Sequence, residues 1–109
     1  MNLWKIIITP EAAEDIKDIY NYIARKLQAP ETAKKQTGKI LEEIHSLESM
    51  PMRYSLYEKE PWRSRGLRKA SSGNFLIFYL TNEDINEVVI LHVLYAGRNV
   101  EEMLTGNES

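Results

Sequence analysis

Arginine and tyrosine residues in the second half of the chain are the side chains best suited to chemistry. A guanidinium group can hold a phosphate through two parallel hydrogen bonds, and a tyrosine can stack on a base or move a proton. Such a set would bind RNA or stabilise a phosphoryl transition state. The alternative is structural, with the arginines paired to nearby carboxylates and the tyrosines filling a sheet surface. The candidates are Arg65, Arg68, Tyr79, Tyr95 and Arg98.

Other catalytic chemistries have little support in the sequence. His45 and His92 are isolated and there is no cysteine, so we expect no metal site. The five glycines are scattered and form no phosphate-binding loop, so no cofactor is expected. Ser71 and Ser72 precede Gly73 in an expected turn, where serine is common and does not indicate a nucleophile.

Positive charge is concentrated in the middle of the sequence. The whole chain has a formal net charge of −2. Residues 51–79 contain six Lys or Arg against two acids, a net charge of +4, whereas residues 80–109 contain one basic residue against six acids. This distribution favours a local anion-binding patch over a uniformly basic nucleic-acid-binding domain. An arginine-rich, solvated strand edge is the alternative.

The length of 109 residues predicts a single domain, over residues 1–104, with a frayed tail over residues 105–109. No apolar run approaches the roughly 18 residues of a membrane-spanning helix. The first residues show no basic region followed by an apolar stretch and a cleavage site, so we expect a cytoplasmic protein that does not contact membranes.

Two helices are predicted in the first half of the chain, after a short strand over Leu3–Thr9. Thr9 and Pro10 are a typical helix start, and Pro30 begins the next helix after breaking the first. The second helix is expected to end at Met50–Pro51. Each helix carries one apolar face, formed by Ala12, Ile16, Ile19, Tyr20, Ile23 and Leu27 in the first and by Ala33, Ile40, Leu41, Ile44 and Leu47 in the second.

Three strands are predicted in the second half, over residues 65–70, 75–80 and 87–95, followed by a short helix over 99–104. The strand over 75–80 is apolar on both faces and should be central. Residues 52–63 show no periodicity, and we interpret them as a crossing loop with aromatic anchors. The predicted fold is therefore α+β with the order β-α-α-β-β-β, an αα-hairpin packed on one face of a small, mainly antiparallel sheet.

These features together resemble the RelE/ParE superfamily of toxins from bacterial type II toxin–antitoxin modules. The likeness covers roughly residues 5 to 104 and implies the same fold. It rests on Ala12…Asp15-Ile16…Ile19-Tyr20…Tyr22-Ile23-Ala24, Pro30…Ala33, Ile40…Ile44…Leu47…Met50-Pro51, Arg65…Leu67-Arg68, Asn74-Phe75-Leu76-Ile77-Phe78-Tyr79 and Val93-Leu94-Tyr95-Ala96-Gly97-Arg98-Asn99.

The superfamily has two branches with different targets. RelE-like toxins are ribosome-dependent nucleases that cut mRNA, whereas ParE-like toxins poison DNA gyrase and lack that catalytic set. Where RelE places an arginine in the central strand this chain has Leu76, and where RelE places a C-terminal tyrosine it has Leu104. The resemblance therefore favours the ParE-like branch, in which the protein is not an enzyme.

The resemblance also implies partners and site residues. We expect a cognate antitoxin, and either gyrase or the ribosome with its mRNA as the target. In a RelE-like endoribonuclease, Arg68 and Arg98 would bind the scissile phosphate, and Tyr95 or Tyr79 would transfer a proton or stack. The expected target- or antitoxin-binding residues are Arg63, Arg65, Lys69 and Tyr79. A third alternative is a toxin-like fold that only binds a partner chain.

Overall fold

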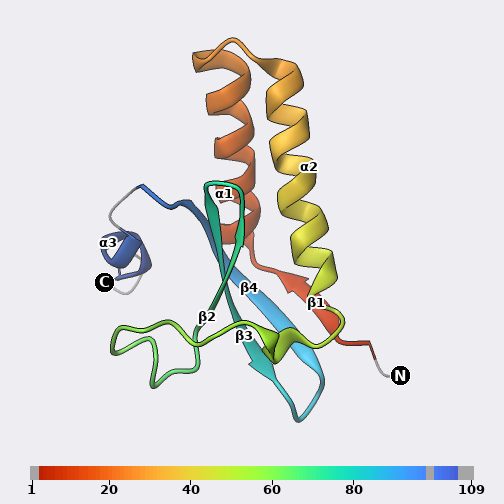
Figure 1. Cartoon of the computed structure of the whole chain (residues 1–109), viewed down its shortest axis with the longest axis vertical. Coiled ribbons are helices and arrows are strands. Elements are labelled where there is room, and N and C mark those ends of the chain that lie inside the picture. Colours follow the sequence, from red (N-terminus) through yellow and green to blue (C-terminus); the bar gives the residue numbers. More distant parts are fainter. Residues whose placement is uncertain (1–2, 98–99, 106–109) are drawn as a thin grey trace.

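The computed structural model describes residues 3–97 and 100–105. Its two long helices stand side by side as a hairpin at one end of the long axis, and the sheet lies below them (Figure 1). This arrangement confirms the predicted α+β fold and its element order. In chain order the elements are β1 (Lys5–Ile8), α1 (Pro10–Asn21), α2 (Pro30–Ser46), β2 (Arg68–Ser72), β3 (Phe75–Asn82), β4 (Glu87–Tyr95) and α3 (Val100–Thr105), with short helical turns η1 (Tyr22–Lys26) and η2 (Pro51–Arg53).

The helix α1 begins where the sequence predicts. Thr9 Oγ1 accepts a hydrogen bond from the backbone N–H of Ala12 at 3.1 Å, which satisfies one of the free donors of the first turn. After Asn21 the chain continues as the π-helical turn η1. A π turn holds one more residue than an α turn and so shifts the following side chains around the helix axis. Consequently Leu27, predicted on the buried face, is 57% exposed.

The helix α2 ends at Ser46 rather than at the predicted Met50–Pro51. Met50 has a φ of 52°, in the left-handed region, so a helix cannot run through it. Leu41, also predicted on the buried face, is 37% exposed. The hydroxyl of Thr37 is buried there instead and donates to the Ala33 carbonyl at 2.9 Å. The buried face consists of Ala33, Thr37, Ile40, Ile44 and Leu47.

The four strands form one sheet in the order β1-β4-β3-β2. β1 pairs with β4 in parallel, and the two other pairings are antiparallel, as the sequence predicts. β4 has the predicted bounds, and β3 is a central strand. β2 differs, because residues 65–67 belong to the preceding turn, where Gly66 has a φ of 85°. Ser72 pairs with Phe75, so the serines lie in the strand and Gly73–Asn74 make the turn.

Each face of the sheet carries its own hydrophobic core. The hairpin-side core packs α1 and α2 against the sheet and contains Ala12, Ile40, Ile44, Leu47, Ala70, Ile77, Tyr79, Val88, Ile90 and Val93. The loop-side core lies on the opposite face, under α3 and the segment before β2, and contains Tyr57, Trp62, Leu67, Phe78, Leu94, Val100 and Leu104. Because strand residues alternate between faces, Phe78 and Tyr79 serve different cores.

The segment over residues 52–63 is a crossing loop with buried aromatic anchors, as predicted. The ring of Tyr57 makes edge-on contacts with Trp62 and with Phe78, with ring centroids 5.9 and 5.7 Å apart. In Figure 1 the loop projects below α3, at the end of the molecule away from the hairpin tip. Within the described part of the chain, no helix has the length and apolar character needed to cross a membrane.

Candidate functional site

Arg68 begins β2 and directs its guanidinium group onto the crossing loop. Nη1 donates to the carbonyl of Tyr54 at 2.6 Å and to that of Met52 at 3.4 Å. The Nε atom is buried without a hydrogen-bond partner among the described residues. Because its guanidinium group is bound to backbone carbonyls of the crossing loop, Arg68 stabilises the position of that loop at the edge of the sheet.

Tyr79 is a core residue. Its side chain is 0% exposed, and its hydroxyl donates to the carbonyl of Pro51 at 2.6 Å. Burial raises the pKa of Tyr79 to about 12, with the nearby Arg68 opposing that shift. The expectation that Tyr79 contacts a substrate or partner is corrected, because β3 turns this ring toward the helical hairpin.

Tyr95 ends β4 and is 47% exposed. Its ring meets that of Phe75, its partner across the β3–β4 ladder, with the centroids 5.9 Å apart. Tyr95 is thus positioned at the surface, where it can contact another molecule.

The structure does not bring Arg68 and Tyr95 together as a catalytic pair. Arg68 pairs with Tyr79, which pairs with Ile90, five residues before Tyr95 on β4. At roughly 3.3 Å per strand residue, the two backbones are more than about 16 Å apart. Arg98, the third residue of the expected set, lies outside the described residues.

Arg63 and Arg65 are exposed on a turn over residues 59–66, which overlaps the end of the crossing loop. We call this turn the basic turn. Its backbone is closed by hydrogen bonds from Arg63 N–H to the Lys59 carbonyl and from Arg65 N–H to the Pro61 carbonyl, at 2.9 and 3.2 Å. Hydrogen bonds from Ser64 hold the pKa of the Glu60 carboxyl below its ordinary value, with a smaller contribution from Arg63. The basic turn is therefore an ordered structure.

Lys69 lies beside the basic turn on β2 and is partly engaged within the chain. Its Nζ is 3.7 Å from a carboxylate oxygen of Glu58 and 5.4 Å from the ring centroid of Tyr57. Lys59, at the start of the turn, forms an ion pair with Glu101 of α3. Lys59 Nζ also donates a hydrogen bond to the Glu101 carboxylate, and this bond lowers the pKa of Glu101 and raises the pKa of Lys59.

An apolar groove of about 880 Å³ runs between α1 and the end of β4. Its rim carries three strongly exposed apolar side chains, Tyr22, Leu27 and Tyr95, at 56, 57 and 47%. Ile19, Ile23, Phe75, Val93, Leu94 and Met103 also line it, together with the polar residues Asp15, Asp18, Thr32, Gln36 and Asn74. A groove that presents several apolar side chains can accept the apolar face of an amphipathic helix. We call this surface the apolar groove.

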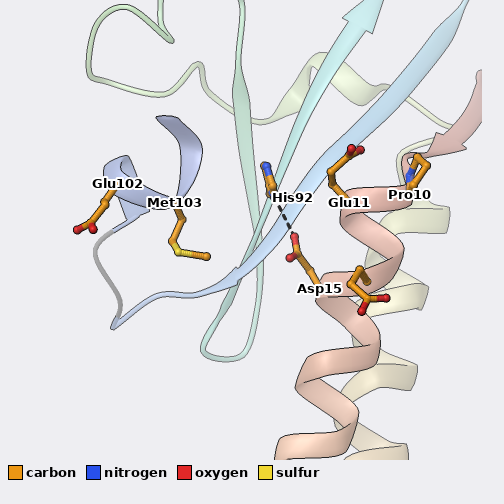
Figure 2. A pocket seen from close by; sticks show the side chains of 7 residues that line it. Pro10, Glu11, Asp15, His92, Glu102 and Met103 are labelled. Atoms are coloured by element: carbon orange, nitrogen blue, oxygen red, sulfur yellow. Dashed lines mark hydrogen bonds and ion pairs between the residues drawn. The ribbon is translucent and has the colours of Figure 1, made fainter. Parts of the chain in front are cut away.

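A smaller groove, lined by residues of α1, β4 and α3, holds a pair that the sequence analysis missed. Asp15 on α1 points toward His92 on β4 (Figure 2), and its Oδ2 also accepts the N–H of Val93 at 3.0 Å. β1 ends at Ile8, opposite Ile90, so the β4 edge beyond it has no strand partner and α1 covers it instead. The available signal was a carboxylate on the apolar face of the helix, three residues after Ala12.

The smaller groove is lined on the α1 side by Pro10, Glu11 and Glu14 and on the α3 side by Glu102 and Met103 (Figure 2). Among residues 3–97 and 100–105, the structure contains no group of three or more side chains that could hold a metal ion. The described surfaces are thus suited to binding macromolecules through apolar burial and through charge.

A family profile described as "ParE toxin of type II toxin-antitoxin system, parDE" matches residues 6–100. Among curated proteins, none has a significantly matching sequence. The chain is similar in structure to the chromosomal ParDE TA system from P. aeruginosa, with a TM-score of 0.69 and 23% identity over 85% of this chain and 96% of that one.

Two other solved structures share the fold at lower identity. The toxin–antitoxin complex RelBE2 from Mycobacterium tuberculosis has a TM-score of 0.63 and 20% identity, covering 87% of this chain and 93% of that one. An archaeal RelE–RelB complex from Pyrococcus horikoshii has a TM-score of 0.60 and 16% identity, covering 88% and 98%.

Proposed function

The chain belongs to the ParE toxin family of type II toxin–antitoxin systems, and from this premise we propose that it inhibits growth by poisoning DNA gyrase and is neutralised by a cognate antitoxin. DNA gyrase as the target and an antitoxin as the neutralising partner are the two proposed elements of this function.

The observation that carries the choice of target is the absence of an assembled nuclease site among the described residues. Leu76 and Leu104 stand where the resemblance to RelE would place catalytic residues, and both pack in or against the loop-side core. Arg68 is bound to loop carbonyls and lies far from Tyr95. General acid–base chemistry on RNA requires its groups within hydrogen-bond reach of one substrate. A binding mechanism, such as trapping gyrase on DNA, needs no such set.

The apolar groove supports the antitoxin half of the proposal. Exposed Tyr22, Leu27 and Tyr95 give an apolar surface that a lone soluble chain leaves in contact with water. An amphipathic segment of an antitoxin would bury these side chains, since helix-in-groove recognition uses apolar residues at helical spacing. Aromatic residues of this kind supply most of the binding energy in typical interfaces.

Two assays with purified protein test the target. In the first, the toxin is added to gyrase, ATP and supercoiled plasmid, and we expect linear DNA to accumulate after detergent and protease treatment. In the second, the toxin is added to ribosomes carrying mRNA, and we expect the message to stay intact. Adding the antitoxin should abolish the DNA breaks. Cleavage of ribosome-bound mRNA without DNA breakage would overturn the gyrase proposal, and inactivity in both assays would indicate a partner-binding module.

A further inference from the structure

The basic turn carries two exposed arginines, Arg63 and Arg65, on an ordered backbone. Trp62, between Pro61 and Arg63, is 9% exposed and packs edge-on against Tyr57. The turn is closed at its neck by hydrogen bonds between Tyr57 N–H and the Leu67 carbonyl, at 2.7 Å, and between Leu67 N–H and the Trp62 carbonyl, at 3.1 Å. Because the backbone is already ordered, little conformational entropy is lost when Arg63 and Arg65 bind.

The surface of the basic turn differs in character from the apolar groove. Every large hydrophobic side chain that is strongly exposed in the described structure lies outside residues 55–67. Protein interfaces normally have an apolar centre, whereas binding to a nucleic-acid backbone depends on charge and needs none. This difference favours phosphates over an acidic protein as the ligand of the basic turn.

The acids at the basic turn have partners within the chain: Glu58 lies 3.7 Å from Lys69, Glu101 pairs with Lys59, and Glu60 accepts the N–H of Ser64 at 2.9 Å. Further acids lie away from the turn. The acidic side chains Glu11, Glu14 and Asp15 gather at the α1 end of the smaller groove. The turn instead lies at the opposite end of the long axis from the hairpin tip and packs on the loop-side core (Figure 1).

We propose that the basic turn, through Arg63 and Arg65, contacts the phosphate backbone of duplex DNA. The inference rests on the proposed function, since a gyrase poison acts where gyrase holds DNA. Guanidinium groups bind phosphate oxygens in a bidentate manner, and such contacts position a protein on DNA without reading its sequence. The apolar groove lies elsewhere, so the surface proposed to supply most of the antitoxin affinity is separate from the DNA contact, and the charge of the turn would only steer the antitoxin.

The direct test measures binding of the purified toxin to a short fluorescent DNA duplex of arbitrary sequence, by anisotropy, over a range of salt concentrations. We expect affinity to fall as salt rises. The double variant Arg63→Glu/Arg65→Glu should bind at least about tenfold more weakly, with the slope of log affinity against log salt reduced by about two. The control Lys34→Glu/Lys35→Glu changes the net charge equally at exposed positions of α2, and its affinity should stay within about threefold of the parent.

Several outcomes would overturn the proposal. They are an absence of salt-dependent DNA binding, equal losses in the two double variants, or weakened binding to the antitoxin with unchanged binding to DNA. The last would make the turn a site for an acidic protein. The melting temperature of each variant should match that of the parent within a few degrees, because the substitutions are at exposed positions. This control separates a loss of binding from a loss of folding.

The gyrase assay distinguishes failure of this inference from failure of the proposed function. If the parent toxin poisons gyrase and Arg63→Glu/Arg65→Glu is equally potent, the DNA contact is wrong and the proposed function stands. The parent toxin could instead leave gyrase unaffected, while Arg63→Glu/Arg65→Glu, but not Lys34→Glu/Lys35→Glu, loses affinity for the DNA duplex. In that case the gyrase target is wrong and the DNA contact stands.

Discussion

The Asp15 carboxylate lies 2.9 Å from Nδ1 of His92, joining α1 to β4 across 77 residues of sequence. Both side chains are mostly buried, at 19% and 13% exposure. The same oxygen accepts the N–H of Val93 beyond the end of β1. Asp15 therefore fixes the crossing of the helical hairpin over the sheet, and with it one wall of the apolar groove.

Replacing this carboxylate should destabilise the fold. Asp15→Ala removes the acceptor of the Val93 N–H and the carboxylate beside His92 Nδ1, and we expect a loss of about 1–3 kcal/mol in the free energy of unfolding. Asp18→Ala, on the exposed side of the same helix, is the control and should change it by less than about 0.5 kcal/mol. Urea denaturation followed by circular dichroism gives both values. Equal midpoints for the two variants would show that Asp15 does not hold the crossing.

The buried Tyr79 hydroxyl predicts a loss of stability at alkaline pH. Its pKa is about 12 in the folded protein against an ordinary value of 10.0, so the unfolded chain gives up the proton first. The stabilisation is complete below pH 10.0 and is lost as the pH rises toward about 12. Tyr79→Phe should make this decline less steep, with the rest due to Tyr57, whose pKa burial also raises to about 12. It should cost about 1 kcal/mol at neutral pH, because the Pro51 carbonyl loses its donor.

Unfolding free energies measured from neutral to alkaline pH test this prediction, with tyrosinate absorbance as a second readout. Tyr22→Phe, at an exposed position, is the matched control for removal of a tyrosine hydroxyl and should change the free energy of unfolding at neutral pH by less than about 0.5 kcal/mol. A Tyr79→Phe profile that declines as steeply as that of the parent protein would contradict the assignment.

The face of α2 toward the sheet can be tested with two substitutions in one helix. Ile44 is 0% exposed in the hairpin-side core, so Ile44→Asp buries an unpaired charge. That typically costs several kcal/mol out of a total of roughly 5–15 kcal/mol, and we expect loss of the cooperative melting transition. Leu41→Asp, at a position 37% exposed, should still melt cooperatively. Similar behaviour of both variants would mean that the helix is rotated from the position described.

The division of labour between apolar and charged surfaces in antitoxin binding can be measured by surface plasmon resonance. Tyr22→Ala should raise the dissociation rate by about tenfold or more, because it removes an exposed aromatic anchor of the apolar groove. Ile85→Ala, at a 60% exposed apolar position of the β3–β4 turn, should leave it unchanged.

Charged contacts should act mainly on association. Replacing Arg63 and Lys69 together should cost at most about 1–2 kcal/mol of affinity, as expected for exposed pairs. Added salt should slow association and leave dissociation nearly constant, since rim charges steer the encounter. A dissociation rate that rises many-fold with salt would mean that charge, not the groove, holds the complex together.

Local sequence determined where α1, α2 and β4 begin and, apart from Leu27 and Leu41, which sides of the two helices face the core. Thr9 and Pro10 start α1, Pro30 starts α2, and the apolar run over residues 87–95 is β4 with the predicted bounds. These features depend on neighbours in the chain: a capping hydroxyl, a fixed proline φ, and side chains repeating at helical or strand period. For the same reason the family resemblance was visible without coordinates.

Tertiary structure decided which residues meet. Arg68 and Tyr95 are both strand residues with suitable chemistry, but the strand pairing puts Arg68 two strands away and in register with Ile90, five residues before Tyr95. Tyr79 lies in a run that is apolar on both faces, so alternation alone could not tell a surface ring from a core ring whose hydroxyl finds a distant carbonyl. The Asp15–His92 contact exists only because β1 stops at Ile8 and leaves a strand edge for α1 to cover. Strand order and register set these distances, and both follow from how the two cores pack rather than from local periodicity.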